Sequence, residues 1–529
     1  MLFFIPAWYQ QNTWSENEQI WFHARKKAEF DDSVKQIQLF HRNKVYDYQI
    51  LLLSFAPNFR HFLHRQSVYR APYWSCFDAI QEVRRKKVFV LSFHNLNWPE
   101  GIEFIYSPFV VIAQLHGVRY AQIDFGEDGN PIQIDLYEDG KLHRRNIYDD
   151  RGFISSTILF KEEKPDYQDY LMENGVWKMR YFYRDGHVEM NPKTPHFLLT
   201  KQETEREVPF SKLRYDSIEQ VIEEVFTAYL ETTDERDVFC AAMHEQHAGI
   251  LQSTLKDRRL VLSFYRDRYS LEKHPEAIDI MKQAGYLVAD SEVTMNEIKS
   301  FAGNQVQKVC SITPYDSRVD YGISQQLKVQ KILVPVDEMD EALFEQVIKY
   351  LAVYLEQNEN ARVTLFTRQP EYFWKSRLLQ MTRIYLVKAG FEEKLAAEVD
   401  DKVSENGTDE EETTVKFFVE QCINELAVSK CMREQRIVAD VRGTLDLYLQ
   451  ILALSIGIPQ ILTQRTQFVE PGKNGIVIEK PEKLPEALAF YLDGLNHWNE
   501  AMVHCREISK YHTTSMLINR WKEVIESVG

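Results

Sequence analysis

Glycine is scarce in this chain, at 20 of 529 residues, against a usual share of ~7%. No G-x-G occurs in the sequence, which excludes the dinucleotide fingerprint and the glycine-rich phosphate loop of kinases as sequence motifs. The P-loop, the G-x-S-x-G elbow and an Asp-x-Asp pair are missing as well. The commonest sequence motifs for phosphate, acyl and metal-dependent sugar chemistry are therefore absent.

Cysteines are few and scattered, and no C-x-x-C pair occurs. The six are Cys76, Cys240, Cys310, Cys422, Cys431 and Cys505. This pattern argues against a disulfide framework or a zinc site, and we expect reduced, buried thiols. His244-Glu245-Gln246-His247 resembles a metalloprotease motif, but its histidines are three residues apart where H-E-x-x-H needs four. We expect this segment to end a strand or begin a helix, and we expect no metal site.

Positively charged residues are fewer than negatively charged ones: the chain has 63 Lys and Arg and 79 Asp and Glu, which gives a net charge of −16. Such a chain repels phosphate backbones, so we expect no nucleic-acid partner. The most basic segments, 59–70 and 84–87, we interpret as solvated faces or helix ends, with an anion or membrane-surface contact as the alternative. No apolar run approaches the ~20 residues that span a bilayer. The opening Met1–Tyr9 lacks a positively charged region and predicts a first buried strand of a cytosolic protein.

Short apolar runs alternate with helical patterns over residues 1–116. This alternation is typical of βαβ units in a doubly wound parallel sheet. The expected strands are Leu2–Ile5, Ile50–Phe55, Val88–Phe93 and Phe109–Gln114, with a long polar helix near 15–42.

The pattern changes over 117–204, where strand-like runs are separated by turns that contain Asp-Gly or Asn-Gly. These dipeptides supply the positive φ that tight hairpins require. The runs are Tyr120–Phe125, Ile132–Tyr137, Leu142–Tyr148, Phe153–Phe160, Trp177–Tyr183 and Val188–Met190. The sequence therefore predicts an antiparallel β insertion within an α/β domain.

After a charged, helical stretch at 205–232, the α/β alternation resumes. The expected strands are Val238–Met243, Leu260–Tyr265, Tyr286–Ala289 and Val309–Ile312, then Lys331–Val336, Arg362–Thr367, Val415–Val419, Arg436–Val441 and Pro459–Leu462. The helices expected between the later strands are 339–357, 373–390, 421–433 and 445–455. The acidic tract 399–412 predicts a surface loop, and one last helix is expected over about 484–528.

These patterns divide the chain into domains. We expect an N-terminal Rossmann-like domain made of residues 1–116 and 205–325, interrupted by the β insertion at 117–204. A C-terminal Rossmann-like domain follows at 326–505, and a C-terminal helix at 506–529.

Aromatic residues are plentiful, with 27 Tyr, 31 Phe and 9 Trp. Flat aromatic faces stack on sugar rings, and Tyr and Trp edges hydrogen-bond to hydroxyl groups. Most of these side chains must lie in the core. Trp8 and Tyr9, in the loop after the first strand, are our candidates for a carbohydrate-facing cleft.

The segment 436–479 is the most informative. It predicts a strand, a turn at Arg442-Gly443-Thr444, a helix, a strand that opens with Gly457-Ile458-Pro459, and a turn at Asn474-Gly475. Backbone amides at the helix N-terminus would form an anion site that faces the cleft. Arg442, Gly443, Thr444, Asn474 and Gly475 are therefore further cleft candidates.

Gly457-Ile458-Pro459 and Asn474-Gly475-Ile476 resemble the nucleotide-sugar half of GT-B glycosyltransferases. The β insertion, with Asp149–Gly152, Ser155-Ser156 and Trp177, resembles the extra β domain of glycosyltransferases that modify serine-rich repeat adhesins. Together with the opening FFIPAWY, the whole chain most resembles the first member of the Asp (accessory secretory protein) family of the accessory Sec system. The resemblance implies an α/β, GT-B-like fold with two Rossmann-like domains facing across a cleft.

The chain departs from active retaining GT-B enzymes at three places. Pro6–Tyr9 replaces their glycine-rich loop, so the backbone cannot approach a phosphate closely. Arg442–Thr444 and Leu452 stand where a glutamate pair flanks the turn and helix, and a leucine accepts no ribose hydrogen bond. Asp337-Glu338 replace the Arg/Lys pair that grips the diphosphate. We therefore expect no catalytic residues and no cofactor.

The resemblance implies a cytoplasmic, non-catalytic export component that binds glycosylated serine-rich repeat adhesins. It also implies a complex with sister accessory proteins that works alongside the accessory Sec motor ATPase. Peripheral contact with the membrane or the translocase is left open. Two alternatives remain. One is an active, sugar-nucleotide-dependent retaining glycosyltransferase in which Arg442 and Lys473 contact the diphosphate. The other is a pure scaffold with an empty cleft.

Overall fold

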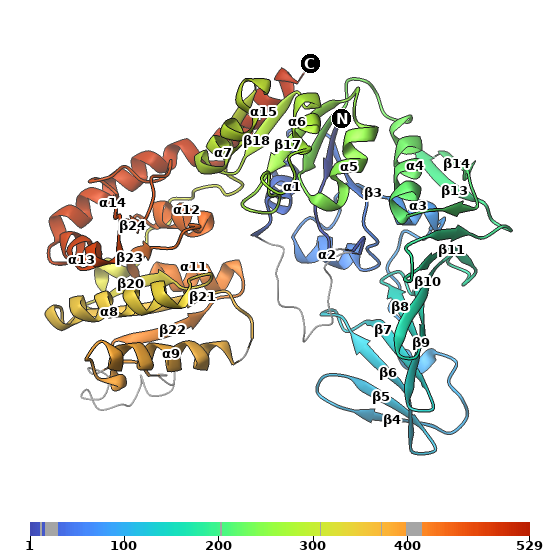
Figure 1. Cartoon of the computed structure of the whole chain (residues 1–529), viewed down its shortest axis with the longest axis horizontal. Coiled ribbons are helices and arrows are strands. Elements are labelled where there is room, and N and C mark those ends of the chain that lie inside the picture. Colours follow the sequence, from blue (N-terminus) through green and yellow to red (C-terminus); the bar gives the residue numbers. More distant parts are fainter. Residues whose placement is uncertain are drawn as a thin grey trace.

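Two parallel β-sheets, each flanked by helices, form the two lobes of the chain, and an antiparallel sheet extends from the first lobe (Figure 1). The computed structural model describes residues 1–10, 13–15, 30–201, 204–306, 308–371, 373–397 and 415–528. The acidic tract 399–412 and most of the first half of the helix expected near 15–42 lie outside the described residues. Nowhere in the described part is a helix both long and apolar enough to cross a bilayer.

The N-terminal lobe is built on a seven-stranded parallel sheet in the order β19-β18-β17-β16-β1-β2-β3. Its strands are β1 (Leu2–Ile5), β2 (Tyr48–Leu52), β3 (Tyr73–Ser75), β16 (Val238–Ala242), β17 (Arg259–Phe264), β18 (Tyr286–Ala289) and β19 (Val309–Ser311). Its helices are α1 (Asp32–Asn43), α2 (Phe59–Arg65), α3 (Cys76–Ile80), α4 (Ile218–Leu230), α5 (Glu245–Thr254), α6 (Ala277–Gln283) and α7 (Glu292–Ala302). The first strand, wholly apolar and buried, pairs with β16 and β2 in the middle of the sheet, where both faces are covered.

Two strands that the sequence predicts for this sheet are not part of it. Residues 88–93 form no strand, and Val88, Phe89 and Val90 are 47%, 61% and 77% exposed. Phe109–Gln114 corresponds to β5 (Val111–Leu115), which pairs antiparallel with β4 (Ile102–Tyr106) and belongs to the other sheet. Both predictions were wrong because an apolar run does not specify its partner strand, which is chosen by tertiary contacts.

The antiparallel sheet has ten strands, in the order β15-β12-β11-β10-β9-β8-β7-β6-β5-β4. The strands not yet given are β6 (Val118–Phe125), β7 (Pro131–Glu138), β8 (Lys141–Asp149), β9 (Phe153–Lys161), β10 (Lys164–Leu171), β11 (Trp177–Phe182), β12 (Val188–Met190) and β15 (Arg214–Tyr215). Every run predicted for the insertion lies in this sheet. The turn glycines take the expected left-handed conformation, as at Gly140 with a φ of 76°. The division of the chain into domains stays a prediction.

A separate ribbon of β13 (His196–Lys201) and β14 (Thr204–Pro209) packs beside α3 and α4. It corrects the helical prediction over 205–232, of which α4 is the helical part. The charged residues of β14 favour a helix locally, but β13 supplies a full ladder of hydrogen bonds along them. Tertiary pairing therefore overrides local propensity here.

The C-terminal lobe has a six-stranded parallel sheet in the order β22-β21-β20-β23-β24-β25. Its strands are β20 (Gln330–Pro335), β21 (Ala361–Thr367), β22 (Phe417–Gln421), β23 (Gln435–Asp440), β24 (Gln460–Leu462) and β25 (Gly475–Val477). Its first helices are α8 (Glu341–Gln357), α9 (Trp374–Lys388), α11 (Glu425–Arg433) and α12 (Leu447–Ile456). The strands and helices predicted here are confirmed, with their ends shifted by a few residues. Gly457 ends α12 with a φ of 80°, the left-handed cap that glycine adopts most easily.

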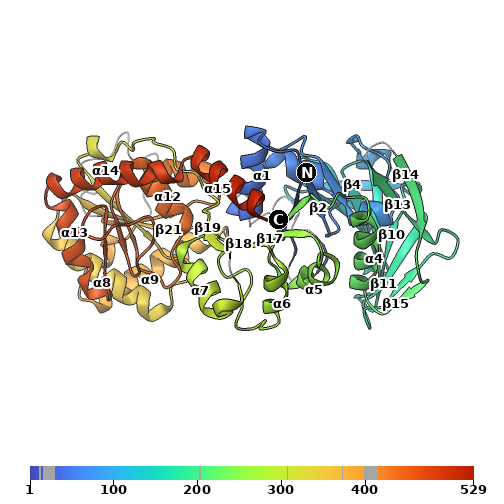
Figure 2. The ribbon, with the colours of Figure 1, turned by 90° about the horizontal axis from the view of Figure 1, so that it is seen from above.

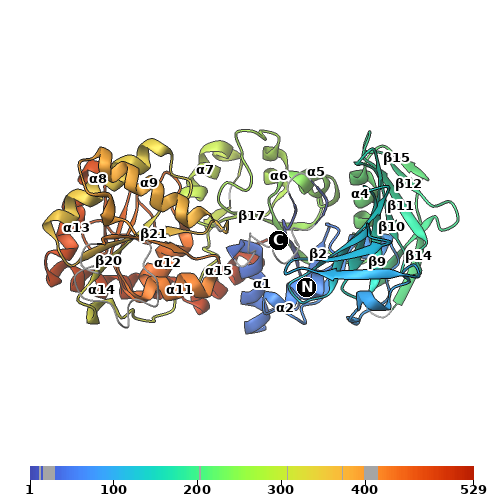
Figure 3. The same ribbon diagram turned by 90° about the horizontal axis from the view of Figure 1, so that it is seen from below.

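The chain ends in three helices, not in the single helix predicted over 484–528. They are α13 (Leu484–Leu492), α14 (Leu495–Ser509) and α15 (Thr514–Ser527). The last of them leaves the C-terminal lobe and lies beside α1 (Figures 2 and 3). There Leu517, Trp521 and Val524 are buried in one cluster with Phe4 and Phe40. The breaks between these helices let the end of the chain pack against both lobes, which one straight helix could not do.

Candidate functional site

A cavity of about 210 Å³ lies between the two lobes. The N-terminal lobe contributes Arg266 and Asp290, which follow β17 and β18, and the C-terminal lobe contributes the turn between β23 and α12. The carboxyl ends of parallel strands are where α/β sheets place their ligands. Of the predicted cleft residues, Gly443 and Thr444 are exposed and line this cavity.

Arg442, at the start of the same turn, is buried and fully engaged within its own lobe. Its Nε and one terminal nitrogen donate to the two carboxylate oxygens of Asp440, each at 2.8 Å, and the other donates to the backbone oxygen of Asp337 at 3.0 Å. Burial disfavours the positive charge, but the hydrogen bonds to Asp440 outweigh it and raise the pKa of Arg442. The guanidinium therefore shapes the turn and is not presented to the cavity.

The N-terminus of α12, where we expect an anion site, already holds a carboxylate of the chain itself. Asp446 is the N-cap, and its Oδ1 accepts a hydrogen bond from the backbone N–H of Leu449 at 3.1 Å. Arg368 lies 2.7 Å from Asp446 Oδ2, and Arg266 of the other lobe lies 3.6 Å from Oδ1. Burial raises the pKa of this carboxyl, but Arg368, Arg266 and Arg442 prevail and lower it to about 2. Asp446 thus stays ionised and holds the position that a phosphate would need.

Asp337, which follows β20, joins two strands of the C-terminal sheet. Its carboxylate accepts hydrogen bonds from the Thr367 hydroxyl and from the backbone N–H of Arg368, the latter at 2.7 Å. These bonds tie the end of β20 to the end of β21. A diphosphate approaching this edge would meet the carboxylate of Asp337, and the nearby guanidinium groups of Arg442 and Arg368 already pair with Asp440 and Asp446.

Trp8, predicted to face the cleft, is a core residue with only 8% of its surface exposed. Its indole N–H donates to Asp31 Oδ1 at 3.0 Å. Its ring centroid lies 4.7 Å from that of Phe62 and 6.0 Å from that of Phe59. Neighbouring aromatic rings therefore occupy the space in which a sugar would stack.

Tyr9 is also buried, against α5. Its hydroxyl lies 2.8 Å from His247 Nδ1, and His247 Nε2 lies 2.6 Å from the backbone oxygen of Ala242. A carbonyl only accepts, so Nε2 carries the proton and Nδ1 accepts from the tyrosine. Burial lowers the pKa of His247 to about 3, so the ring is neutral. The histidine of the His-Glu-Gln-His segment therefore anchors the first loop.

Asn474 and Gly475 build the turn between β24 and β25. Asn474 has no exposed surface; its Oδ1 accepts from the Glu470 N–H at 2.8 Å and its Nδ2 donates to the Phe468 oxygen at 2.9 Å. A Cβ at Gly475 would lie 2.4 Å from the backbone oxygen of Gln460, so only glycine fits there. These two residues position the wall of the cavity, which includes Phe468. Direct ligand contact by the predicted cleft residues stays a prediction.

The residues missed from the sequence are those that meet only in the folded chain: Arg266, Asp290, Gln450 and Gln467, all of which line the cavity. Of these four residues, only Gln450 could have been recognised from the sequence. It is the single polar residue between Leu447 and Leu454 apart from a tyrosine, and such a residue in an apolar helix needs a partner or a purpose.

The basic segments 59–70 and 84–87, which the sequence presents separately, meet in one groove of about 630 Å³ on the first lobe. Arg70, Lys86 and Lys87 are exposed along it. The two segments therefore form one surface of the molecule.

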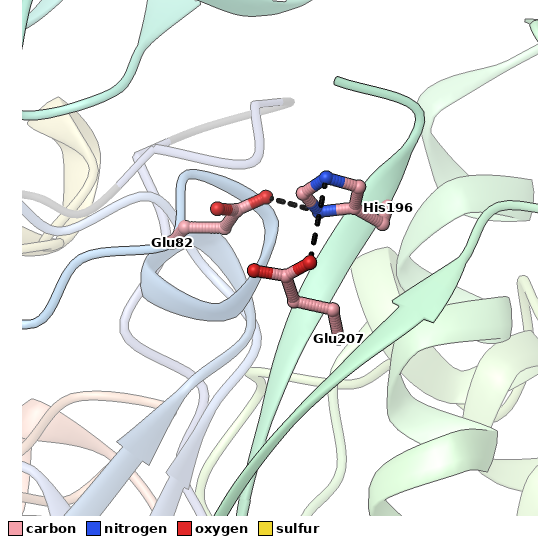
Figure 4. A group of neighbouring side chains, drawn as sticks. All are labelled: Glu82, His196 and Glu207. Atoms are coloured by element: carbon pink, nitrogen blue, oxygen red, sulfur yellow. Dashed lines mark ion pairs between the residues drawn. The ribbon is translucent and has the colours of Figure 1, made fainter.

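Glu82, His196 and Glu207 come together beside this groove, on the loop after α3 and on the β13–β14 ribbon (Figure 4). His196 Nδ1 lies 2.6 Å from Glu82 and His196 Nε2 lies 3.7 Å from Glu207. The buried ammonium of Lys178 also contacts Glu82, and Arg84 lies 3.9 Å from it. These cations already balance the carboxylates, so the group is an ion-pair network that joins the ribbon to α3.

Two lobes with parallel sheets, a cavity between them and a β-rich extension define a GT-B-like protein. The chain superposes over 100% of its length on 98% of the pneumococcal O-GlcNAc transferase GtfA, whose structure is in complex with UDP and GlcNAc. The TM-score is 0.70 and the sequence identity 11%, a likeness of fold alone. The predicted fold class is confirmed.

The chain belongs to the family of accessory secretory protein 1 of the accessory Sec system, whose family model matches residues 1–527. It is 30% identical over 531 residues to the accessory Sec system protein of this family from Staphylococcus aureus, covering 99% of each chain. A chain in the crystal structure of accessory secretory proteins 1, 2 and 3 from Streptococcus pneumoniae is 26% identical, with a TM-score of 0.79 over 100% of this chain and 99% of that one. The resemblance inferred from the residues is therefore confirmed.

Proposed function

We propose that this chain is a non-catalytic component of the accessory Sec export system that binds glycosylated serine-rich repeat adhesins and helps to export them. The family match over residues 1–527 supports the accessory Sec role, and the observation that carries the non-catalytic part is the carboxylate of Asp446 at the N-terminus of α12. It is ionised, hydrogen-bonded to the helix and paired with Arg368 and Arg266. A sugar nucleotide would have to displace this carboxylate and break its ion pairs before its phosphates could bind.

The proposal includes a complex with sister accessory proteins at the cytoplasmic face of the membrane. Its support is the similar chain from S. pneumoniae, whose structure contains accessory secretory proteins 1, 2 and 3. The accessory Sec motor ATPase and the glycosylated adhesin are the other proposed partners, and contact with the membrane would be peripheral, through the translocase. No cofactor is needed for such a role.

The alternative of an active glycosyltransferase requires Arg442 and Lys473 to hold a diphosphate. Arg442 is committed to Asp440, and Lys473 pairs with Glu470 at 2.8 Å on the surface. Neither is a ready phosphate ligand, so this alternative is the weaker one. The scaffold alternative, in which the cavity binds nothing, is decided by the same experiment.

The test is calorimetric titration of the full-length protein with UDP-sugars and, separately, with a serine-rich peptide that carries N-acetylglucosamine. Glycopeptide binding without UDP-sugar binding is the expected result. Micromolar UDP-sugar binding with slow release of sugar would establish the enzyme instead. If neither ligand binds while the sister proteins still co-purify, the protein is a scaffold.

A further inference from the structure

The groove of about 630 Å³ on the first lobe concentrates positive charge on a chain whose net charge is −16. Among the described residues, seven arginines and lysines line this groove, but only two carboxylates. Arg60, Arg84 and Arg151 are paired with carboxylates of the chain itself. The other four cations are exposed and have no ion pair with any described residue: Arg70, Arg85, Lys86 and Lys87. The groove therefore has positive charge that the fold itself does not neutralise.

Glutamates of the chain already bind the basic segment 84–87. Glu173, between β10 and β11, accepts hydrogen bonds at Oε1 from the backbone N–H groups of Arg84 and Arg85, at 2.7 and 2.6 Å. Glu205, on β14, accepts from Arg84 Nε at 3.0 Å. Two carboxylates from different parts of the chain thus meet this segment. A ligand with carboxylates of the same kind would extend this pattern to the cations that remain unpaired.

The buried cations of the groove are not available to hold a single phosphate ion. Arg60 lies 2.9 Å from Asp149, and Arg151 lies 2.7 Å from Asp78. The unpaired cations are exposed side chains, and one exposed ion pair contributes little binding energy. A ligand must therefore offer several negative charges to bind here, as an acidic stretch of polypeptide does.

The apolar part of the groove favours a polypeptide over a bilayer. Tyr69 and Val88 line the groove and are 57% and 47% exposed, and aromatic side chains are common at protein interfaces. Phe89, the next residue, is held against the β insertion. Its N–H donates to the Asp150 oxygen at 3.3 Å, and a Cβ added to Gly152 would come within 2.8 Å of its ring. An extended chain can enter a groove, whereas a flat bilayer surface would meet only its rim.

We propose that this groove binds an extended acidic segment of a partner protein. Its Asp or Glu carboxylates pair with the four exposed cations, and its apolar side chains contact Tyr69 and Val88. The proposal assigns a partner surface on the first lobe and does not depend on what the cavity between the lobes binds. Because the cations are exposed, the association is sensitive to salt.

Two double variants of the full-length protein test the surface. Lys86→Gln with Lys87→Gln removes two of the four cations; both side chains are exposed, so the melting temperature is expected to stay the same. Lys161→Gln with Lys164→Gln is the matched control. It makes the same change of charge at two exposed lysines that face each other across the β9–β10 turn, outside the lining of the groove.

The probe is a short fluorescein-labelled peptide in which Glu alternates with Leu, and its binding is followed by fluorescence anisotropy. We expect this peptide to bind at low salt and to dissociate as salt is added. The same peptide with Gln in place of Glu is expected not to bind. The Lys86–Lys87 variant should bind the Glu peptide about fivefold more weakly, and the Lys161–Lys164 variant as tightly as the unaltered chain.

Three results would overturn the proposal. The first is no binding of the Glu peptide by the unaltered chain, and the second is equal binding by the two double variants. The third comes from sedimentation with phosphatidylglycerol vesicles. Vesicle binding that only the Lys86–Lys87 variant loses, without any peptide binding, would make these cations a membrane contact instead.

Discussion

The carboxylate of Asp446 is the group on which the non-catalytic assignment depends, and Asp446→Asn tests its role directly. Asparagine is as good an N-cap as aspartate, so the hydrogen bond to the Leu449 N–H can remain. What is lost is the negative charge between Arg368 and Arg266, which come from different lobes. The two guanidinium groups would then lose the counter-ion that they share.

The cost follows from the pKa of the carboxyl, which falls from 3.8 to about 2 on folding. Each pKa unit corresponds to about 1.4 kcal/mol, so the ionised form stabilises the fold by roughly 2.5 kcal/mol. A depressed pKa in the folded state gives stability that is present above pH 3.8 and lost as the pH falls through 2. At neutral pH the substitution should therefore cost the full amount.

Thermal and urea unfolding at pH 7 measure this cost. Asp340→Asn is the matched control, because Asp340 caps α8 through the Leu343 N–H at 2.7 Å and has no ion pair among the described residues. Its expected cost is below about 0.5 kcal/mol. A loss for Asp446→Asn no larger than that of the control would refute the ion-pair argument.

Removing the side chain altogether, in Asp446→Ala, should uncover the anion site at the start of α12. Millimolar pyrophosphate is then expected to raise the melting temperature of this variant and leave that of the unaltered protein unchanged. If pyrophosphate stabilises the unaltered protein as well, the carboxylate does not block the site, and the argument against nucleotide binding fails.

Three further predictions concern the packing of the N-terminal lobe. His247 has a pKa of about 3 in the folded state against 6.5 when unfolded. Its contribution to stability is therefore complete above pH 6.5 and falls by about 1.4 kcal/mol for each pH unit below that. His247→Gln should flatten this slope in urea unfolding measured at several pH values. Tyr9→Phe removes the hydroxyl partner of His247 and should lower the free energy of unfolding by about 1 kcal/mol in the same assay. An unchanged free energy of unfolding would show that this hydrogen bond does not stabilise the fold. Trp521→Ala, on the buried face of α15, should cost about 3–5 kcal/mol and increase proteolysis near the C-terminus. An unchanged stability and digestion pattern would show that this side chain does not hold α15 to the first lobe.

The sequence by itself determined the strands and the first four helices of the C-terminal lobe and the character of the β insertion. Alternating apolar runs and helical periodicity suffice where a parallel strand is buried on both faces, as in β20 and β23. Asp-Gly and Asn-Gly turns mark hairpins because their backbone conformation is a local property. The two acidic residues Asp337-Glu338 were likewise visible without a structure, since charge is carried by the residue type.

Only the tertiary structure decided which residues meet. Trp8 and Tyr9 looked like cleft aromatics, yet Phe62 and His247, distant in sequence, enclose them. Arg266 and Asp446 are 180 residues apart in the chain and become partners because the lobes face each other at the carboxyl ends of their sheets. Periodicity reports which face of an element is buried, but the identity of the covering element is a property of the whole fold. The cavity between the lobes, and with it the site, exists only at that level.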